Sequence, residues 1–184
     1  MEVIEAEIDG VKIIRPNIYR DNRGYFIESY SQKKFEYEVY NTVFVQDNES
    51  SSKYGVLRGL HYQKAPFAQA KLVRVIKGKV LDIAVDIRKE SSTFGKHVAV
   101  ELSDENKLQV FIPRGFAHGF IVLSKEAICQ YKCDNYYFPS HAEGIKWDDE
   151  LLNINWKLPV EDIILSEKDK INPTFSQLFF PQNY

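Results

Sequence analysis

Residues 71–87 read KLVRVIKGKVLDIAVDI, with alternating side-chain character on both sides of Lys77-Gly78. A two-residue period is typical of a β-strand that turns one face toward a core. Glycine at the break supplies the backbone freedom that a tight turn needs. The pattern therefore predicts two strands, 71–75 and 80–87, joined as a hairpin.

More short strands are predicted on the carboxyl side of this segment, at 98–102, 108–112, 119–123 and 127–133. Strands at this spacing favour an all-β sandwich or barrel over alternating βα units. Helical signals are few. Ser31 can cap a short helix that runs through Tyr40 with Phe35 and Val39 on one face, and Ser166 begins another. The apolar residues 175–184 are expected to dock against the body of the protein.

The composition predicts one soluble domain that spans residues 1–184. The length is sufficient for a real core, and twelve Phe with eleven Tyr favour strands. A formal charge of −2 gives no general attraction to nucleic acid or to an anionic membrane. The amino terminus lacks the cationic start and apolar core of a secretion signal, so we expect a cytoplasmic protein.

Cys129 and Cys133 lie four residues apart in one predicted strand. That spacing corresponds to roughly 13 Å, which is too far for a disulfide. A zinc pair would need two more soft ligands, and none stand nearby. Both residues are therefore expected to be free thiols, as suits a reducing compartment.

Residues 44–63 read FVQDNESSSKYGVLRGLHYQ and hold an unusual density of polar groups for a β-rich region. Arg58 and His61 stand three residues apart among Gly55 and Gly59, which suggests a backbone bent to aim polar groups at a ligand. A lone histidine is more often structural, yet its neighbours here favour a proton-transfer role. Arginine and lysine side chains elsewhere could clamp an anion: Arg23, Arg58, Lys71 and Lys168.

Two further residues each have a structural and a functional interpretation. Asp169 is either an exposed acid in the first turn of a helix capped by Ser166, or an inward carboxylate that orients a histidine. Tyr131 shares a strand face with the two cysteines and should point inward. It is either a core tyrosine or a general acid.

The segment Pro113-Arg114-Gly115-Phe116-Ala117-His118 resembles the second half of a cupin signature, Pro-x-Gly-x-x-His. In metal cupins the first half supplies a His-x-His pair. Here that pair reads His61-Tyr62-Gln63, so one imidazole is missing. Two histidines alone make a poor site for a first-row metal, and no metal is expected.

Taken together, these segments resemble the dTDP-4-dehydrorhamnose 3,5-epimerase family over nearly the whole chain. The most specific run is Gly55-Val56-Leu57-Arg58-Gly59-Leu60-His61-Tyr62-Gln63. The other matching runs are Asp21-Asn22-Arg23-Gly24, Gln46-Asp47-Asn48, Lys71-Leu72-Val73-Arg74-Val75, Val85-Asp86-Ile87-Arg88, Ile112 to Phe120, Tyr131-Lys132, Glu143 to Trp147 and Ser166 to Asp169.

The resemblance implies a cupin-type antiparallel jelly roll with a few short helices, mostly near the carboxyl terminus. It implies a homodimer with exchange of amino-terminal strands, and neither metal nor cofactor. His61 would be the general base oriented by Asp169, Tyr131 the general acid, and Lys71 the cation that stabilises an enolate. The residues implied for dTDP-sugar binding are Arg23, Glu28, Gln46, Asp47, Asn48, Arg58, His118, Tyr137, Glu143 and Lys168.

The implied reaction inverts C3 and C5 of dTDP-4-dehydro-6-deoxy-D-glucose to give dTDP-4-dehydro-L-rhamnose, a step of dTDP-L-rhamnose biosynthesis. A ketone at C4 acidifies both neighbouring hydrogens, so no nicotinamide is needed. A C3-only epimerase or a ketoisomerase on a related nucleotide 4-keto-sugar would use the same base. A noncatalytic sugar-binding cupin and a metal cupin oxygenase are the alternatives of another class.

Overall fold

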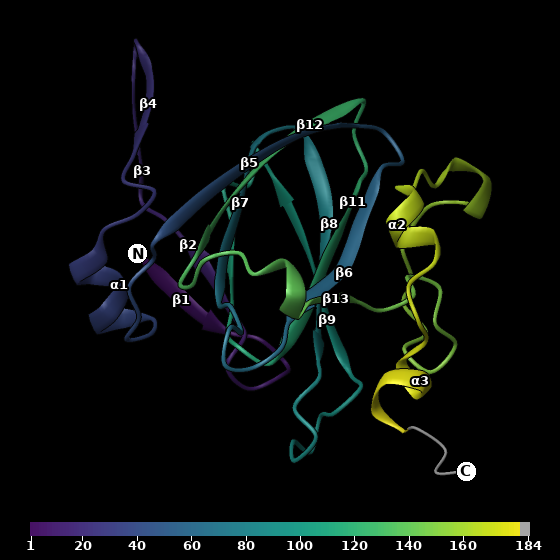
Figure 1. Cartoon of the computed structure of the whole chain (residues 1–184). Helices are drawn as coiled ribbons and strands as arrows, with labels where there is room; N and C mark the ends of the chain where they lie inside the picture. Colours follow the sequence, from purple (N-terminus) through teal and green to yellow (C-terminus); the bar gives the residue numbers. More distant parts are fainter. Residues whose placement is uncertain (181–184) are drawn as a thin grey trace.

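Two antiparallel β-sheets face each other in the computed structural model, which describes residues 1–180 (Figure 1). One sheet has six strands in the order β1 (Glu2–Glu5), β2 (Lys12–Arg15), β10 (Gln109–Ile112), β7 (Lys71–Lys77), β12 (Glu126–Cys133) and β5 (Gln46–Lys53). The other has five, in the order β13 (Ala142–Gly144), β6 (Leu57–Gln63), β11 (Phe116–Val122), β8 (Lys79–Asp86) and β9 (His97–Ser103). The predicted all-β jelly-roll class is thereby confirmed.

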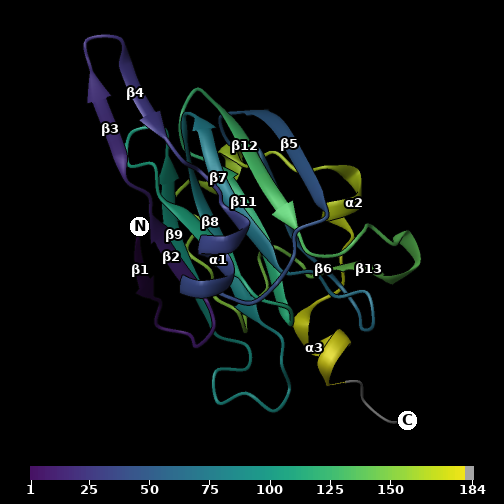
Figure 2. The same ribbon diagram turned by 90° about the vertical axis from the view of Figure 1, so that its left-hand side faces the viewer.

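The remaining elements are short. A two-stranded hairpin, β3 (Ile18–Asp21) and β4 (Gly24–Ile27), projects away from the sheets in both views (Figures 1 and 2). The helices are α1 (Gln32–Glu38), α2 (Glu167–Lys170), α3 (Phe175–Phe179) and the 3₁₀ turns η1 (Pro139–His141) and η2 (Val160–Asp162). No helix within residues 1–180 has the length and apolar character needed to cross a bilayer.

The core has three layers, because both sheets are covered on their outer faces as well. Between the sheets lie the inward side chains of the central strands, such as Val73, Val80 and Phe120. The carboxyl-terminal segment covers the outer face of the five-stranded sheet with Trp156 and Phe175. Helix α1 covers part of the other outer face through a third cluster. Strands β8 and β11 are therefore buried on both faces along almost their whole length.

The predicted hairpin at residues 71–87 is wrong. The chain does turn at Gly78, where φ is +78° and a Cβ would lie 2.0 Å from the Glu126 carbonyl oxygen. The two strands then enter different sheets: β7 pairs with β10 and β12, whereas β8 pairs with β11 and β9. Because inward residues of both strands are apolar, facing each other across the core buries them better than pairing side by side would.

The other predicted strands are confirmed as β9, β10, β11 and β12, with small shifts at their ends. The amino-terminal helix begins after Ser31 but ends at Glu38, and the Ser31 side chain makes no capping hydrogen bond. Phe35 and Val39, predicted to share one face, are both buried. Phe175 is also buried, in α3, while residues 181–184 of the predicted docking segment lie outside the described residues.

A buried carboxylate ends β8 and predicts a pH-dependent contribution to stability. Asp86 is fully buried and accepts hydrogen bonds from Arg88, from Ser91 Oγ at 2.6 Å and from Thr93 Oγ1 at 2.6 Å. Burial alone raises the pKa of Asp86, but these hydrogen bonds outweigh it and lower the pKa to about 2. A depressed pKa means that the unfolded chain binds the proton more tightly. The stabilisation is therefore complete above pH ~4 and is lost as the pH falls toward ~2.

Asp86→Asn is expected to lower the free energy of unfolding at neutral pH by about 2 kcal/mol. The pKa of Asp86 falls from 3.8 to about 2 in the folded protein, and each pKa unit is worth about 1.4 kcal/mol. It should also flatten the fall in stability between pH ~4 and ~2. Denaturant unfolding across that pH range measures both effects. Asp148→Asn is a control, since that side chain is 42% exposed. Equal stability of Asp86→Asn and the parent at neutral pH would contradict the prediction.

Candidate active site

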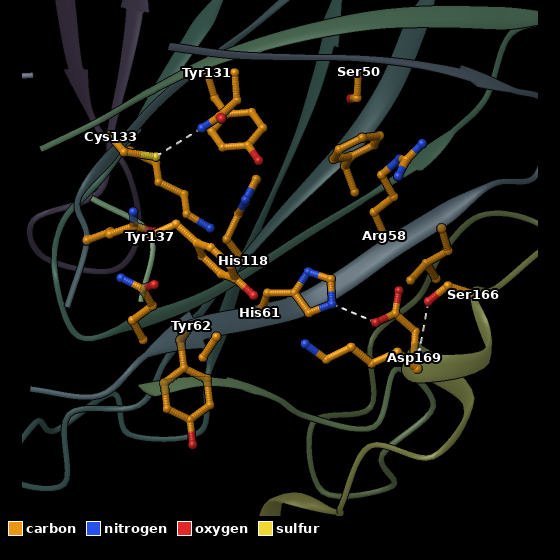
Figure 3. A pocket seen from close by; sticks show the side chains of 18 of the residues that line it. Ser50, Arg58, His61, Tyr62, His118, Tyr131, Cys133, Tyr137, Ser166 and Asp169 are labelled. Carbon is orange, nitrogen blue, oxygen red and sulfur yellow. Dashed lines mark hydrogen bonds and ion pairs between the residues drawn. The ribbon is translucent and has the colours of Figure 1, made fainter. Parts of the chain in front are cut away.

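A pocket of about 630 Å³ lies between the two sheets and is bordered by α2 (Figure 3). Cavities of roughly 300–1,000 Å³ are typical of small-molecule sites. Most of the predicted site residues line it: Gln46, Asn48, Arg58, His61, Lys71, His118, Tyr131, Tyr137, Glu143, Lys168 and Asp169. They come from strands of both sheets, the loop after β12, and α2.

A bulge in β6 places Arg58 and His61 on the same face. Residues three apart on a regular strand point to opposite faces. The pairing of β6 with β11 shifts register here, so that His118 pairs with His61 but Phe120 pairs with Arg58. Gly59 takes up the extra residue with φ of +134°, and its missing Cβ would lie 2.5 Å from Gly119 Cα. The backbone distortion expected among these glycines is therefore present.

His61 forms a pair with Asp169, and Figure 3 shows them side by side in the pocket. Their Nε2 and Oδ1 atoms are 2.6 Å apart, and the Asp169 side chain is only 5% exposed. Ser166 Oγ accepts the Asp169 backbone N–H at 3.1 Å, so the residue also occupies the predicted first turn of a capped helix. The exposed orientation, one of two alternatives from sequence, is therefore wrong, whereas the predicted helix start is correct.

The Asp169–His61 bond fixes the state of both groups. Burial raises the pKa of Asp169, but the hydrogen bonds from His61 and Ser166 outweigh it and the net pKa lies below its ordinary value. A carboxylate can only accept, so His61 Nε2 carries the proton. In the neutral form of this imidazole, Nδ1 has the lone pair that can take a proton from a ligand.

Tyr131 and Lys71 line the pocket from the opposite, six-stranded sheet. Lys71 Nζ lies 5.7 Å from the centre of the Tyr131 ring. Burial raises the pKa of Tyr131, so its phenol keeps its proton at neutral pH. Burial lowers the pKa of Lys71, although nearby Cys133 and Asp82 oppose this. The predicted inward orientation of Tyr131 is confirmed.

His118 belongs to a second buried pair, with Asp82 as its partner. His118 Nε2 and Asp82 Oδ2 are 2.9 Å apart, and the side chains are 6% and 1% exposed. Burial lowers the pKa of His118, against the opposing effect of Asp82. The sequence reasoning missed Asp82. Its signal was a charged residue between Val80 and Ala84, two inward positions of a buried strand.

Polar groups continue around the rim of the pocket. Arg58 Nε donates to Ser52 Oγ at 3.0 Å. Glu143 accepts a hydrogen bond from Tyr62 OH at 2.6 Å and pairs with Lys64 Nζ at 2.7 Å. Charged and amide groups around an enclosed space suit a polar, anionic ligand.

Three predicted site residues are not brought to this pocket. Strand β5 alternates, so Gln46 and Asn48 face inward while Asp47 faces out and pairs with Lys132 at 2.8 Å. Arg23 lies at the turn of the projecting β3–β4 hairpin and pairs with Asp21. Glu28 pairs with Lys34 near α1.

The pocket also contains residues that the sequence reasoning did not select. Ser50 continues the inward face of β5, which the two-residue period from Gln46 and Asn48 could have revealed. Gln63 and Gln69 line it as well. Among residues 1–180, no group of three or more His, Cys, Asp or Glu side chains is placed to hold a metal ion.

The chain is similar to known proteins along almost its entire length. The family model for dTDP-4-dehydrorhamnose 3,5-epimerase matches residues 5–177. The dTDP-4-dehydrorhamnose 3,5-epimerase of Shigella flexneri is 56% identical over 170 residues, which cover 92% of this chain and 93% of that protein.

Solved structures of similar proteins match this chain as well. The dTDP-4-dehydrorhamnose 3,5-epimerase from Elizabethkingia anophelis is 50% identical with a TM-score of 0.92, covering 100% of this chain and 99% of that one. The dTDP-6-deoxy-D-glucose-3,5-epimerase from Legionella pneumophila, in complex with dTDP-4-keto-L-rhamnose, is 50% identical with a TM-score of 0.91, covering 94% and 92%. The chain therefore belongs to the dTDP-4-dehydrorhamnose 3,5-epimerase family.

Proposed function

We propose that this protein is an isomerase that inverts C3 and C5 of dTDP-4-dehydro-6-deoxy-D-glucose to give dTDP-4-dehydro-L-rhamnose. One observation carries the proposal: His61, paired with Asp169, and the partly buried Tyr131 line one pocket from opposite sheets. A sugar ring between them would have His61 on one face and Tyr131 on the other. Removal of a proton from one face and its return from the other inverts the carbon.

The reaction uses the C4 ketone at each centre. His61 Nδ1 takes the proton from the carbon beside the ketone, and the electron pair moves to the C4 oxygen to give an enolate. Lys71 lies against Tyr131 and would stabilise that oxygen, as preorganised cations do. Tyr131 then returns a proton from the opposite face, and solvent restores both groups. The scheme moves only protons, so it requires no redox cofactor.

The nucleotide would occupy the rest of the pocket. Arg58 and Lys168 would contact the diphosphate, while Gln46, Asn48, His118 and Glu143 would hold the sugar and the base end. Tyr137, which is 55% exposed, would stack on the thymine. Buried, unpaired thiols at Cys129 and Cys133 suit a reducing compartment, which supports a cytoplasmic location.

We further propose a homodimer in which the β3–β4 hairpin reaches the pocket of a second copy. The hairpin projects from the body and exposes Tyr19 at 60% and Phe26 at 67%. Large exposed aromatic groups in one segment are typical of an interaction surface. Such an exchange would bring Arg23 and Glu28 to the diphosphate end of the partner's site, which their positions within one chain do not allow.

The activity is tested by turnover of dTDP-4-dehydro-6-deoxy-D-glucose in deuterium oxide, followed by proton NMR. The product should carry deuterium at both C3 and C5, because Tyr131 returns a proton that comes from solvent and not the one that His61 removed. Deuterium at C3 alone would identify a C3-only epimerase. Product without deuterium at either carbon would exclude an enolate route with solvent exchange.

The dimer is tested by mixing two inactive variants. Arg23→Ala and His61→Ala should each be poor enzymes alone. If Arg23 acts in the partner's pocket, a mixed dimer has one site with both changes and one intact site, so about half of the parent activity per mixed dimer returns. If Arg23 acts within its own chain, both sites of the mixed dimer stay defective, and the exchange proposal would be wrong.

A further inference from the structure

Gln63 holds the position where a metal cupin would have its second histidine, and it is used structurally instead. It is the last residue of β6, and the bulge at Gly59 turns it toward the pocket together with His61. The residue is only 7% exposed. A buried amide needs hydrogen-bond partners, because each unpaired donor or acceptor costs free energy.

The partners of Gln63 are all backbone groups of two loops. Its Nε2 donates to the Phe67 carbonyl at 2.7 Å and to the Tyr136 carbonyl at 3.1 Å. Its Oε1 accepts the Phe138 N–H at 2.7 Å. Two of these three bonds therefore bracket Tyr137, one on each side.

The same loop is fixed at two further points. Gln69 Nε2 donates to the Asn135 carbonyl at 2.7 Å, and the rings of Phe67 and Phe138 lie 3.8 Å apart. By contrast, Tyr137 is 55% exposed. Its side chain lines the pocket (Figure 3). The placement of the Tyr137 ring therefore depends on the backbone that Gln63 holds.

Only an amide can make this set of bonds. A carboxylate at the same position would offer no donor to the two carbonyls, and a thioether would offer neither donor nor useful acceptor. A backbone held in its bound position loses less conformational entropy when a ligand arrives, which favours tighter binding.

We propose that Gln63 is a positioning residue for nucleobase recognition: it preorganises the loop that carries Tyr137, through which it acts on affinity and not on proton transfer. This inference rests on the proposed function, in which Tyr137 stacks on the base of a thymidine diphosphate sugar. It gives different roles to two pocket residues of β6, with His61 for chemistry and Gln63 for binding.

The test replaces Gln63 by methionine, which keeps the length and removes the hydrogen bonds. The dissociation constant for dTDP and the KM for the sugar nucleotide should rise on the order of 10-fold, with kcat within about 2-fold. Affinity for inorganic pyrophosphate, which lacks a base, should not change. Hydrogen–deuterium exchange at the Phe138 amide should become faster.

A double-mutant cycle separates this role from general destabilisation. In a Tyr137→Ala background, Gln63→Met should change dTDP affinity by less than about 2-fold, since the ring that the loop places is gone. Gln177→Met is the matched control, because that amide also bonds to backbone, in the capping box of α3 outside the pocket. It should lower stability without changing KM.

Several results would overturn the inference: an equal loss of dTDP affinity with and without Tyr137, a fall in kcat at constant KM, or unchanged dTDP binding. If Gln63→Met does not fold, Gln69→Met removes one fixed point of the same loop and should shift dTDP affinity in the same direction. Unchanged affinity there would also overturn it. If the parent protein neither binds dTDP nor turns over the sugar nucleotide, the proposed function itself is refuted. If the parent does both and the Gln63→Met variant binds dTDP equally well, only this inference is refuted.

Discussion

His61→Ala is expected to lower kcat/KM by about 10²–10⁴-fold, the usual contribution of a positioned general base. In the proposed mechanism, His61 Nδ1 is the ring nitrogen that accepts the substrate proton, because Nε2 is committed to the Asp169 carboxylate at 2.6 Å. Steady-state kinetics with the 4-keto sugar nucleotide measure the loss, and dTDP binding should be almost unchanged. His97→Ala is the matched control, a half-buried histidine outside the pocket.

Asp169→Asn should lose less than His61→Ala while the fold is kept. The amide removes the charge that orients the imidazole and stabilises its protonated form, but the base itself remains. Ser166 can still cap the helix through its hydroxyl, so α2 should stay in place. Activity of His61→Ala within a few-fold of the parent would refute the assignment of the base.

Tyr131→Phe is expected to lower complete epimerisation by about 10²-fold or more while leaving substrate affinity within a few-fold. In the proposed mechanism the phenol acts on the enolate and not on the nucleotide, so its loss should affect the transition state more than the ground state. Deuterium exchange into the substrate should persist, since His61 can still remove a proton, exchange it with solvent and return a deuteron to the same face. Proton NMR in deuterium oxide separates exchange from inversion.

Tyr54→Phe is the control for this variant, because its hydroxyl donates to Asp162 at 3.1 Å outside the pocket. It should retain the parent rate of inversion. Full inversion by Tyr131→Phe would mean that another group, or water, supplies the second proton. Loss of exchange together with inversion would instead place Tyr131 in the step that forms the enolate.

The sequence predicts those features of the fold and the site that follow from a two-residue alternation or from a local concentration of polar residues. The alternation in residues 98–133 predicts four strands and also the inward direction of Tyr131. The density of polar groups around Arg58 and His61 marks the pocket. These features depend on which face of a strand is apolar, and the alternation of apolar and polar residues along the sequence indicates that face.

Features that depend on distant pairing could not be derived in this way. A glycine turn at Gly78 is compatible with a hairpin or with a change of sheet, and only the partners of β7 and β8 decide between them. The role of Gln63 has no signature in adjacent residues, because two of its three hydrogen-bond partners, Tyr136 and Phe138, lie more than 70 residues away. Asp82 does have a local signal, a charge among buried apolar residues, but its partner His118 lies 36 residues away. Asp47 shows an error of the other kind. It is adjacent to Gln46 and Asn48 in the motif, but the alternation of β5 points its side chain to the other face of the strand.

The carboxyl-terminal segment, which covers the five-stranded sheet with Trp156 and Phe175, also contains Asp169. The His61–Asp169 pair joins residues 108 positions apart, and Asp169 reaches His61 only where this segment is docked on the five-stranded sheet. A chain with both sheets formed but this segment undocked would have a shaped pocket and an unoriented imidazole. In the proposed mechanism, turnover therefore reports that the carboxyl-terminal segment is docked, which a measurement of strand content does not.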